Sequence, residues 1–256
     1  MKVDAKPVKQ CTTKQIAWQW DMVAKSRDDQ LRSGLDVSYD QVLSPAILQL
    51  IQAKSSHRVL DVGCGSGVLA ERIAYLAQSV VGVDPSQKSI ALARASTLRP
   101  ANTEYISESI EAYSDNYQGE FFDIAIANMV LQDAADLTAV LDSVARVLRC
   151  DGTFVCTITH PCFWPAYWGY DRCEWFDYGK EIAIDAPFRI SSVEEPVGRT
   201  THFHRPLGQY VTAFHDTNFQ VDSLVEPFPS RAIQRLYPQP WSFPRFMAVR
   251  ACRRQR

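Results

Sequence analysis

The most informative part of the sequence is Val59-Leu60-Asp61-Val62-Gly63-Cys64-Gly65-Ser66-Gly67-Val68-Leu69-Ala70. An apolar run leads into three alternate glycines, and an apolar helical pattern follows at once. Glycines at a strand-to-helix turn let a ligand approach the backbone closely at the carboxyl edge of a parallel sheet. The stretch therefore predicts a ligand-binding loop between a buried strand and a helix.

A second strand pattern supplies an acidic partner for this loop. Residues 80–84, Val-Val-Gly-Val-Asp, end in Asp84, where a carboxylate can accept both hydroxyls of a ribose. The glycine spacing is G-x-G-x-G, whereas dinucleotide enzymes prefer G-x-G-x-x-G. Asp61 would oppose a pyrophosphate but suits a ligand with an ammonium or sulfonium group. The residues therefore favour S-adenosylmethionine over NAD.

Strand and helix patterns alternate on both sides of this loop. Strand patterns cover residues 58–62, 80–84, 104–106, 122–128, 153–159, 219–225 and 242–250, and helical patterns cover 67–77, 86–97, 136–148 and 206–214. Such alternation predicts parallel βαβ units with right-handed crossovers. We expect an α/β fold, a Rossmann-like, doubly wound, mostly parallel sheet of seven strands.

Two segments flank this framework. Residues 1–54 show two helical patterns and predict an N-terminal helical cap. Residues 160–205 follow the fifth strand, hold ten aromatic residues and show no clean period, which predicts an insertion folded over the sheet. The expected organisation is a cap over 1–54 and a cofactor-binding domain over 55–256, with a lid over 160–205.

Composition excludes several classes of protein. With 27 Lys and Arg against 29 Asp and Glu, the formal charge is -2, so no basic field attracts nucleic acid. No apolar run approaches the roughly 18 to 20 residues that span a bilayer, and the polar N-terminus is unlike a secretory signal. Seven irregularly spaced cysteines fit a reducing cytoplasm and show no zinc spacing. We expect a cytoplasmic protein without membrane contact or bound metal, and the sequence makes no prediction of oligomeric state.

The motif VLDVGCGSG, with the strands around it, resembles the class I S-adenosylmethionine-dependent methyltransferases between about residues 57 and 160. Within them, the chain is similar to the small-molecule branch of ubiquinone/menaquinone-type enzymes. The resemblance implies S-adenosyl-L-methionine as cofactor and S-adenosyl-L-homocysteine as product. It places the methionine part at the glycine loop and the ribose at Asp84. The adenine contact falls to Ser109 in ISESIEAY, where the family usually has Asp. The implied cofactor residues are Asp61, Gly63, Cys64, Gly65, Gly67, Asp84, Pro85, Ser109, Ile110, Asn128 and Met129.

Methyl transfer from a sulfonium is an in-line displacement, so holding the acceptor in position supplies most of the acceleration. A base matters only when the acceptor carries a proton at working pH. His160 directly follows the fifth strand and is the candidate base. The alternative is a histidine that caps the strand end through hydrogen bonds to the backbone. Asp133 and Glu226 are weaker candidates, with a surface position as the alternative for each.

Acceptor residues are expected in the cap and the lid. Trp20, Tyr39, Trp164 and Tyr167 would roof an apolar or aromatic acceptor or enclose an amine, although packing into a small core explains such aromatics equally well. The choice of Tyr39 rests on the family resemblance. His204 and Arg205 form a further pair, in which Arg205 would fork onto an acceptor carboxylate; an exposed pair at a helix entry is the alternative.

These expectations combine into a metal-independent methyltransferase acting on a small molecule in a closed pocket. Four alternatives stay open. They are a methyltransferase acting on RNA or protein, a cyclase or lyase that uses the sulfonium of the same cofactor, a protein that binds the cofactor without turnover, and an NAD-dependent oxidoreductase.

Overall fold

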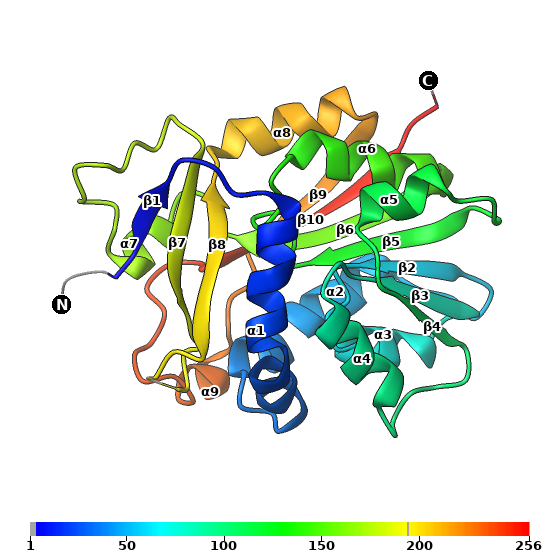
Figure 1. Ribbon diagram of the computed structural model, residues 1–256, viewed down its shortest axis with the longest axis horizontal. Coiled ribbons are helices and arrows are strands. Elements are labelled where there is room, and N and C mark those ends of the chain that lie inside the picture. The colour runs from blue at the N-terminus through cyan, green and yellow to red at the C-terminus, as the bar shows by residue number, and fades with distance from the viewer. Residues whose placement is uncertain (1–3, 194, 256) are drawn as a thin grey trace.

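The computed structural model, which describes residues 4–193 and 195–255, contains two β-sheets with a long helix between them (Figure 1). The strands of the larger sheet are β2 (Arg58–Val62), β3 (Ser79–Val83), β4 (Thr103–Ile106), β5 (Phe122–Asn128), β6 (Leu148–Thr159), β9 (Phe219–Val225) and β10 (Phe246–Arg253). Their order is β4-β3-β2-β5-β6-β10-β9. Only β10 runs antiparallel to its neighbours among these strands. The predicted doubly wound sheet of seven strands is confirmed.

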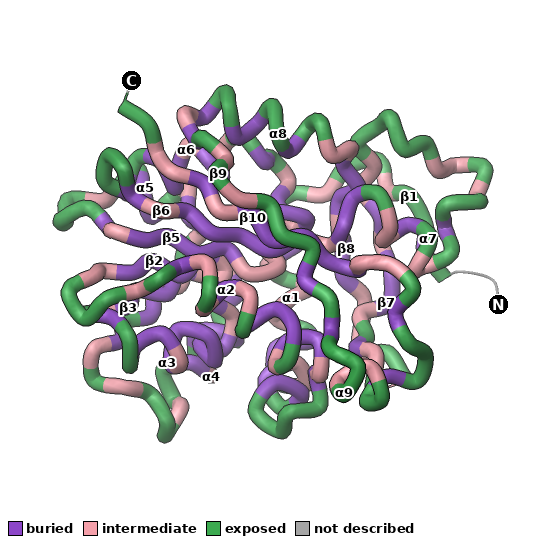
Figure 2. The backbone as a smooth tube through the Cα atoms, turned by 180° about the vertical axis from the view of Figure 1, so that it is seen from behind, coloured by how far each residue is buried: buried purple, intermediate pink, exposed green. Residues whose placement is uncertain are grey.

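Helices cover both faces of this sheet. In Figure 1, α5 (Ile110–Asp115), α6 (Leu137–Val147) and α8 (Leu207–Asp216) lie above the strands, and α2 (Ser44–Ile51), α3 (Val68–Ala74) and α4 (Gln87–Ala95) lie below. Side chains of β2 alternate between the two cores, because Leu60 and Val62 join one buried cluster and Val59 joins the other. The burial of the central strands is visible in Figure 2. A sheet buried on both faces needs the nearly continuous apolar runs that the sequence shows.

The smaller sheet is formed by β1 (Lys6–Val8), β7 (Ile182–Phe188) and β8 (Gly198–His204), in the order β1-β7-β8. The sequence predicted helices alone for the cap and no regular element for the lid, so both expectations were incomplete. Strand β1 of the cap pairs with β7 of the lid, with Lys6 opposite Asp185. The lid also contains the short helix α7 (Trp164–Trp168). Cap and lid thus share one sheet.

Helix α1 (Thr13–Arg32) lies between the two sheets and packs against α4 and β8 (Figure 1). Its first turn is fixed by a capping box, in which Thr12 and Gln15 satisfy each other's backbone amides. Gly198 on β8 permits close approach, because a Cβ there would lie 2.5 Å from Val23 of α1. The π-helical turn η1 (Tyr39–Leu43) and the short helix α9 (Arg231–Gln234) complete the fold. None of the helices in the described part of the chain has the length and apolar character needed to cross a membrane.

Candidate functional site

The glycine loop after β2 is shaped by left-handed backbone at three positions. Gly63, Gly65 and Gly67 have φ values of +64°, +55° and +80°. A Cβ on Gly63 would lie 2.5 Å from Val130, and one on Gly67 would meet the ring of Tyr105. A Cβ on Gly65 would meet nothing within 4 Å, so this residue faces open space. The loop therefore leaves bare backbone beside a cavity, as the sequence motif predicts.

Asp61 carries a buried carboxyl group beside this loop. Its side chain is 1% exposed, and Oδ2 has no hydrogen-bond partner among the described residues. Burial, reinforced by the nearby charge of Asp84, raises the pKa of Asp61 to about 8. An unpartnered carboxylate is costly in such a place, so the site is suited to a ligand that brings positive charge.

Asp84 connects the end of β3 to the glycine loop. Its Oδ2 accepts a hydrogen bond from the Gly65 amide at 2.9 Å, and its Oδ1 accepts one from the Ser86 amide at 2.8 Å. Burial raises the pKa of Asp84 to about 6, although these two bonds act in the opposite direction. The carboxylate therefore orients the loop as well as facing the cavity.

The end of β5 is strained. Met129 has a φ of +59°, which is uncommon for a residue with a side chain. Its amide donates to the Thr157 carbonyl at 2.9 Å, and Thr157 Oγ1 donates to Asn128 Oδ1 at 2.6 Å. These bonds hold Asn128 and Met129 at the carboxyl edge of the sheet. Strain held in this way is often found at functional sites.

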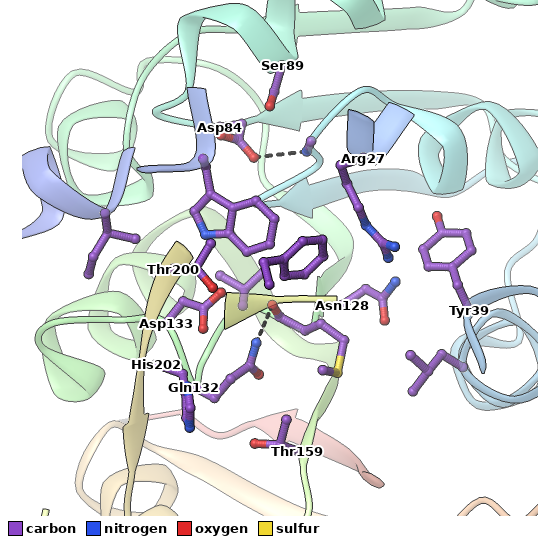
Figure 3. Close-up of a pocket in the computed structure, with 18 of the residues that line it drawn as sticks. Arg27, Tyr39, Asp84, Ser89, Asn128, Gln132, Asp133, Thr159, Thr200 and His202 are labelled. Carbon is purple, nitrogen blue, oxygen red and sulfur yellow. Dashed lines mark hydrogen bonds between the residues drawn. The ribbon is translucent and has the colours of Figure 1, made fainter. Parts of the chain in front are cut away.

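One cavity of about 570 Å³ joins these features. Its volume falls in the range of roughly 300 to 1,000 Å³ typical of small-molecule sites. Of the predicted cofactor residues, all but Gly67 line it; Gly67 instead precedes α3 as its N-cap. Figure 3 shows the space between Asp84, Tyr39 and Asp133. The sequence motifs thus converge on one cavity.

The other end of the cavity is formed by the segment after β5 and by the smaller sheet. Gln132 is buried, and its Nε2 donates to the Met129 carbonyl at 2.5 Å while its Oε1 has no partner in the described chain. Burial raises the pKa of Asp133 to about 8, although contacts with Gln132 and Trp20 oppose this. His202 of β8 also lines the cavity, and burial lowers its pKa to about 4. In Figure 3, Asp133 lies near Thr200 of β8.

All four predicted aromatic acceptor residues line the cavity: Trp20, Tyr39, Trp164 and Tyr167. Tyr39 is buried, and the guanidinium groups of Arg27 and Arg72 lie 5.7 and 5.4 Å from its ring centre. Burial raises the pKa of Tyr39 well above its usual value, so its hydroxyl stays neutral. These rings give the cavity apolar walls.

His160 does not line this cavity. Its Nε2 lies 2.8 Å from a carboxylate oxygen of Glu226, and its Nδ1 accepts from the Cys162 amide at 3.2 Å. Its backbone amide donates to the Arg245 carbonyl, and its ring packs on Phe163. The structure therefore places the predicted base, with both ring nitrogens engaged, behind the cavity wall.

His204 and Arg205, the predicted acceptor pair, also lie outside the cavity. Arg205 is 1% exposed, and its donors bond to Glu181 at 2.6 Å and to the carbonyls of Leu131 and Ala134 at 3.0 and 2.6 Å. His204 Nε2 lies 3.1 Å from the Tyr178 carbonyl. Arg205 thus anchors the end of β8 to the segment after β5, and its guanidinium does not line the cavity.

Sequence reasoning missed several polar residues that line the cavity: Arg27, Gln132, Thr159, His202 and Arg245. A signal existed for Arg245, because it immediately precedes β10, whose first residue pairs with Thr159 at the end of β6. The first residues of an antiparallel strand lie beside the carboxyl end of the strand with which it pairs. For His202, no signal was available before the pairing of β7 with β8 was known.

No group of His, Cys, Asp and Glu in residues 4–193 and 195–255 is arranged to hold a metal ion.

Comparisons with known proteins agree with this geometry. Residues 60–156 match the family model described as "Methyltransferase domain". A ubiquinone biosynthesis O-methyltransferase of Chelativorans sp. (strain BNC1) is 41% identical over 103 residues, which are 40% of this chain and 40% of that protein. The chain thus spans about two fifths of the length of the curated relatives it matches.

Solved structures extend the likeness to nearly the whole fold. A putative S-adenosylmethionine-dependent methyltransferase from Listeria monocytogenes has a TM-score of 0.61 at 21% identity, over 83% of this chain and 98% of that one. The [4+2]-cyclase SpnF has a TM-score of 0.64 at 16% identity, over 97% and 98%. Residues 60–156 therefore resemble a methyltransferase domain, within a fold that solved S-adenosylmethionine-dependent methyltransferases share, and the implied cofactor is S-adenosyl-L-methionine.

The residues present fit that cofactor. The orphaned Oδ2 of Asp61 suits its positive charge, and the open space over Gly65 admits a ligand against the backbone. Asp84 lines the cavity where the ribose is expected, and it has acceptor capacity beyond its two backbone bonds.

Proposed function

We propose that this chain transfers the methyl group of S-adenosyl-L-methionine to a small molecule held in the cavity between its two sheets. One observation carries the proposal: a single cavity is lined both by the glycine loop and by aromatic residues of the cap and lid. A donor and an acceptor bound there would be aligned with little water between them. Such positioning supplies most of the acceleration of a displacement reaction.

Residues at one end of the cavity would hold the cofactor. The carboxylate of Asp61 would balance the charge of the methionine part, and Asp84 would accept hydrogen bonds from the ribose hydroxyls. Ser109 and Ile110, at the start of α5, would border the adenine. When bound, S-adenosylmethionine supplies a methyl group on a sulfonium, which an electron-rich atom of the acceptor attacks in line.

The acceptor end favours an aromatic or apolar molecule over an amine. Trp20, Trp164 and Tyr167 supply apolar walls. The guanidinium group of Arg245 lines the same cavity without an ion-pair partner among the described residues, so a cationic amine would meet a charge of its own sign. The near-neutral total charge also argues against a polynucleotide.

Asp133 is the better candidate for a proton acceptor. Its carboxyl group lines the cavity, and a pKa of about 8 is close to the optimum for a general base at neutral pH. For His160 we propose the alternative role, in which its bonds to Glu226 and to the backbone fix the end of β6.

The test is an incubation of the purified protein with methyl-labelled S-adenosylmethionine and a fractionated extract of its own cells. The expected result is label in one small-molecule fraction, absent when Asp84→Ala replaces the wild type. Label in RNA or protein would overturn the choice of acceptor class. Consumption of the cofactor without label in any pool would favour a cyclase or lyase, and an intact cofactor that binds tightly would favour a protein without turnover.

A further inference from the structure

Arg245 is a buried cation at the acceptor end of the cavity. Arg245 is 6% exposed, and it lines the cavity beside Thr159. It lies immediately before β10, and its carbonyl accepts the amide hydrogen of His160. The guanidinium therefore belongs to the wall that closes the cavity beyond the end of β6.

Arg245 lacks the counter-ion that the buried Arg205 and the half-buried Arg27 have. Arg205 pairs with Glu181 at 2.6 Å, and Arg27 pairs with Asp36 at 2.7 Å. No carboxylate of residues 4–193 or 195–255 forms an ion pair with Arg245. Its hydrogen bonds, to Ser191 Oγ and the Gln239 carbonyl, are both 3.4 Å long, at the outer limit for such bonds.

Aromatic rings surround the same guanidinium. The centres of the Tyr167, Trp241 and Tyr237 rings lie 4.1, 4.6 and 5.5 Å from its central carbon. These rings hold the group by cation–π attraction but cannot accept its in-plane hydrogen bonds. Burial lowers the pKa of Arg245, and only the two tyrosines oppose this, so no acidic side chain compensates. Leaving a buried cation in this state is costly unless a ligand completes it.

We infer that Arg245 binds a carboxylate group carried by the methyl acceptor. This inference rests on the function proposed above and specifies its substrate class as an aromatic or apolar acid. A planar guanidinium presents parallel N–H groups that match the two oxygens of a carboxylate. From the sequence alone we expected this role for Arg205, but Arg205 bonds to Glu181 and to two backbone carbonyls and does not line the cavity. Arg245 lines the cavity and makes only two long hydrogen bonds within the protein.

The test compares trans-cinnamate with the neutral, matched trans-cinnamamide as ligands of the full chain. Binding is followed by tryptophan fluorescence at constant ionic strength and saturating S-adenosylhomocysteine. We expect the acid to bind the wild type at least tenfold more tightly than the amide, and Arg245→Met to lose this preference. If the wild type bound the acid and the amide equally well, or bound neither, the inference would be overturned by the wild type alone.

Arg58→Met is the matched control. Arg58 also lies over an aromatic ring, 5.4 Å from the centre of Phe122, but it does not line the cavity. This variant should keep the preference for the acid. Loss of the preference in Arg58→Met as well would show an unspecific effect of charge and contradict the assignment.

A second arm separates the acceptor's carboxylate from that of the cofactor. S-Adenosylhomocysteine carries a carboxylate, whereas methylthioadenosine does not. Arg245→Met should leave the affinities for both unchanged; a loss confined to S-adenosylhomocysteine would assign Arg245 to the cofactor instead. Failure of the wild type to bind S-adenosylhomocysteine would contradict the proposed function. The comparison of cinnamate with cinnamamide, repeated without S-adenosylhomocysteine, would then still test the role of Arg245.

Discussion

The ionisation of Asp61 should govern how the cofactor binds. Because burial raises its pKa to about 8, the folded protein holds a proton that the unfolded chain releases near pH 4. The stability of the cofactor-free protein should therefore fall as pH rises from about 4 to 8. A bound cation favours the ionised carboxylate, so the affinity for S-adenosylmethionine should rise through the upper part of this window.

Thermal melts from pH 5 to 9, with and without S-adenosylmethionine, check this prediction. Asp61→Asn cannot ionise, so the contribution of Asp61 to both trends should disappear in that variant. An affinity that falls with rising pH in the wild type would contradict the proposed placement of the cofactor's charge.

Asp84→Ala should weaken S-adenosylhomocysteine binding by about 1.5 to 3 kcal/mol, the range for losing a charged hydrogen-bonding partner. The loss combines the proposed ribose contact with the hydrogen bond that Asp84 accepts from the Gly65 amide. Calorimetry measures it directly. Asp123→Ala is the control, because Asp123 accepts from the Arg58 amide at the opposite end of the sheet and should not affect affinity. Equal affinities of Asp84→Ala and the wild type would remove the ribose assignment.

We expect substitutions of Asp133 and of His160 to have different effects on turnover. Asp133→Asn should lower kcat by about 100-fold if the acceptor must lose a proton, with cofactor affinity nearly unchanged. His160→Ala should lower Tm, through loss of its bonds to Glu226 and Cys162, and should leave the pH profile of kcat in place. If steady-state kinetics instead showed a large loss of kcat in His160→Ala and none in Asp133→Asn, His160 would be the base.

At the scale of elements, the contact between α1 and β8 links the cap to the lid. Gln19 of α1 donates to Thr201 Oγ1 at 3.0 Å and accepts the Thr201 amide at 2.8 Å. The same helix carries Trp20 and Arg27 to the cavity. The acceptor end therefore depends on how closely helix and strand approach at Gly198.

Gly198→Leu should destabilise the protein by about 1 to 3 kcal/mol, because its side chain would overlap Val23 and push α1 away from β8. Acceptor affinity should fall more than cofactor affinity, since the glycine loop is untouched. Gly208→Ala in α8 is the control: its Cβ has open space, so no loss of stability is expected. Denaturant unfolding and ligand titration measure the two effects. Equal unfolding free energies for Gly198→Leu and the wild type would contradict the close packing.

At the scale of the whole molecule, local patterns predicted the large sheet well. All of its strands except β10 lie next to a helical pattern in the sequence. Asp61, Gly63 and Asp84 fall at strand ends whose position follows from parallel pairing. The cap and lid were not predictable in the same way. Strand β1 is three residues long and pairs with a partner more than 170 positions away, so its conformation depends on tertiary contact.

The same difference separates the predicted site residues that line the cavity from those that do not. Cofactor residues are set by a contiguous motif, and all but Gly67 line the cavity. Arg205 and Arg245 both lie beside strand ends, and only tertiary structure reveals that one bonds to carbonyls after β5 while the other faces the cavity. Sequence thus predicts the backbone cradle, and packing decides which charged side chains remain free for a ligand.

The central claim is that one cavity holds the cofactor at the glycine loop and the acceptor under the lid. A crystal structure with S-adenosylhomocysteine tests it most directly. We expect the ribose at Asp84, the homocysteine beside Asp61, and the sulfur facing the space between Asp133 and Thr159. A ligand that instead filled the space beside Trp164 and Arg245, leaving Asp84 without contact, would contradict it.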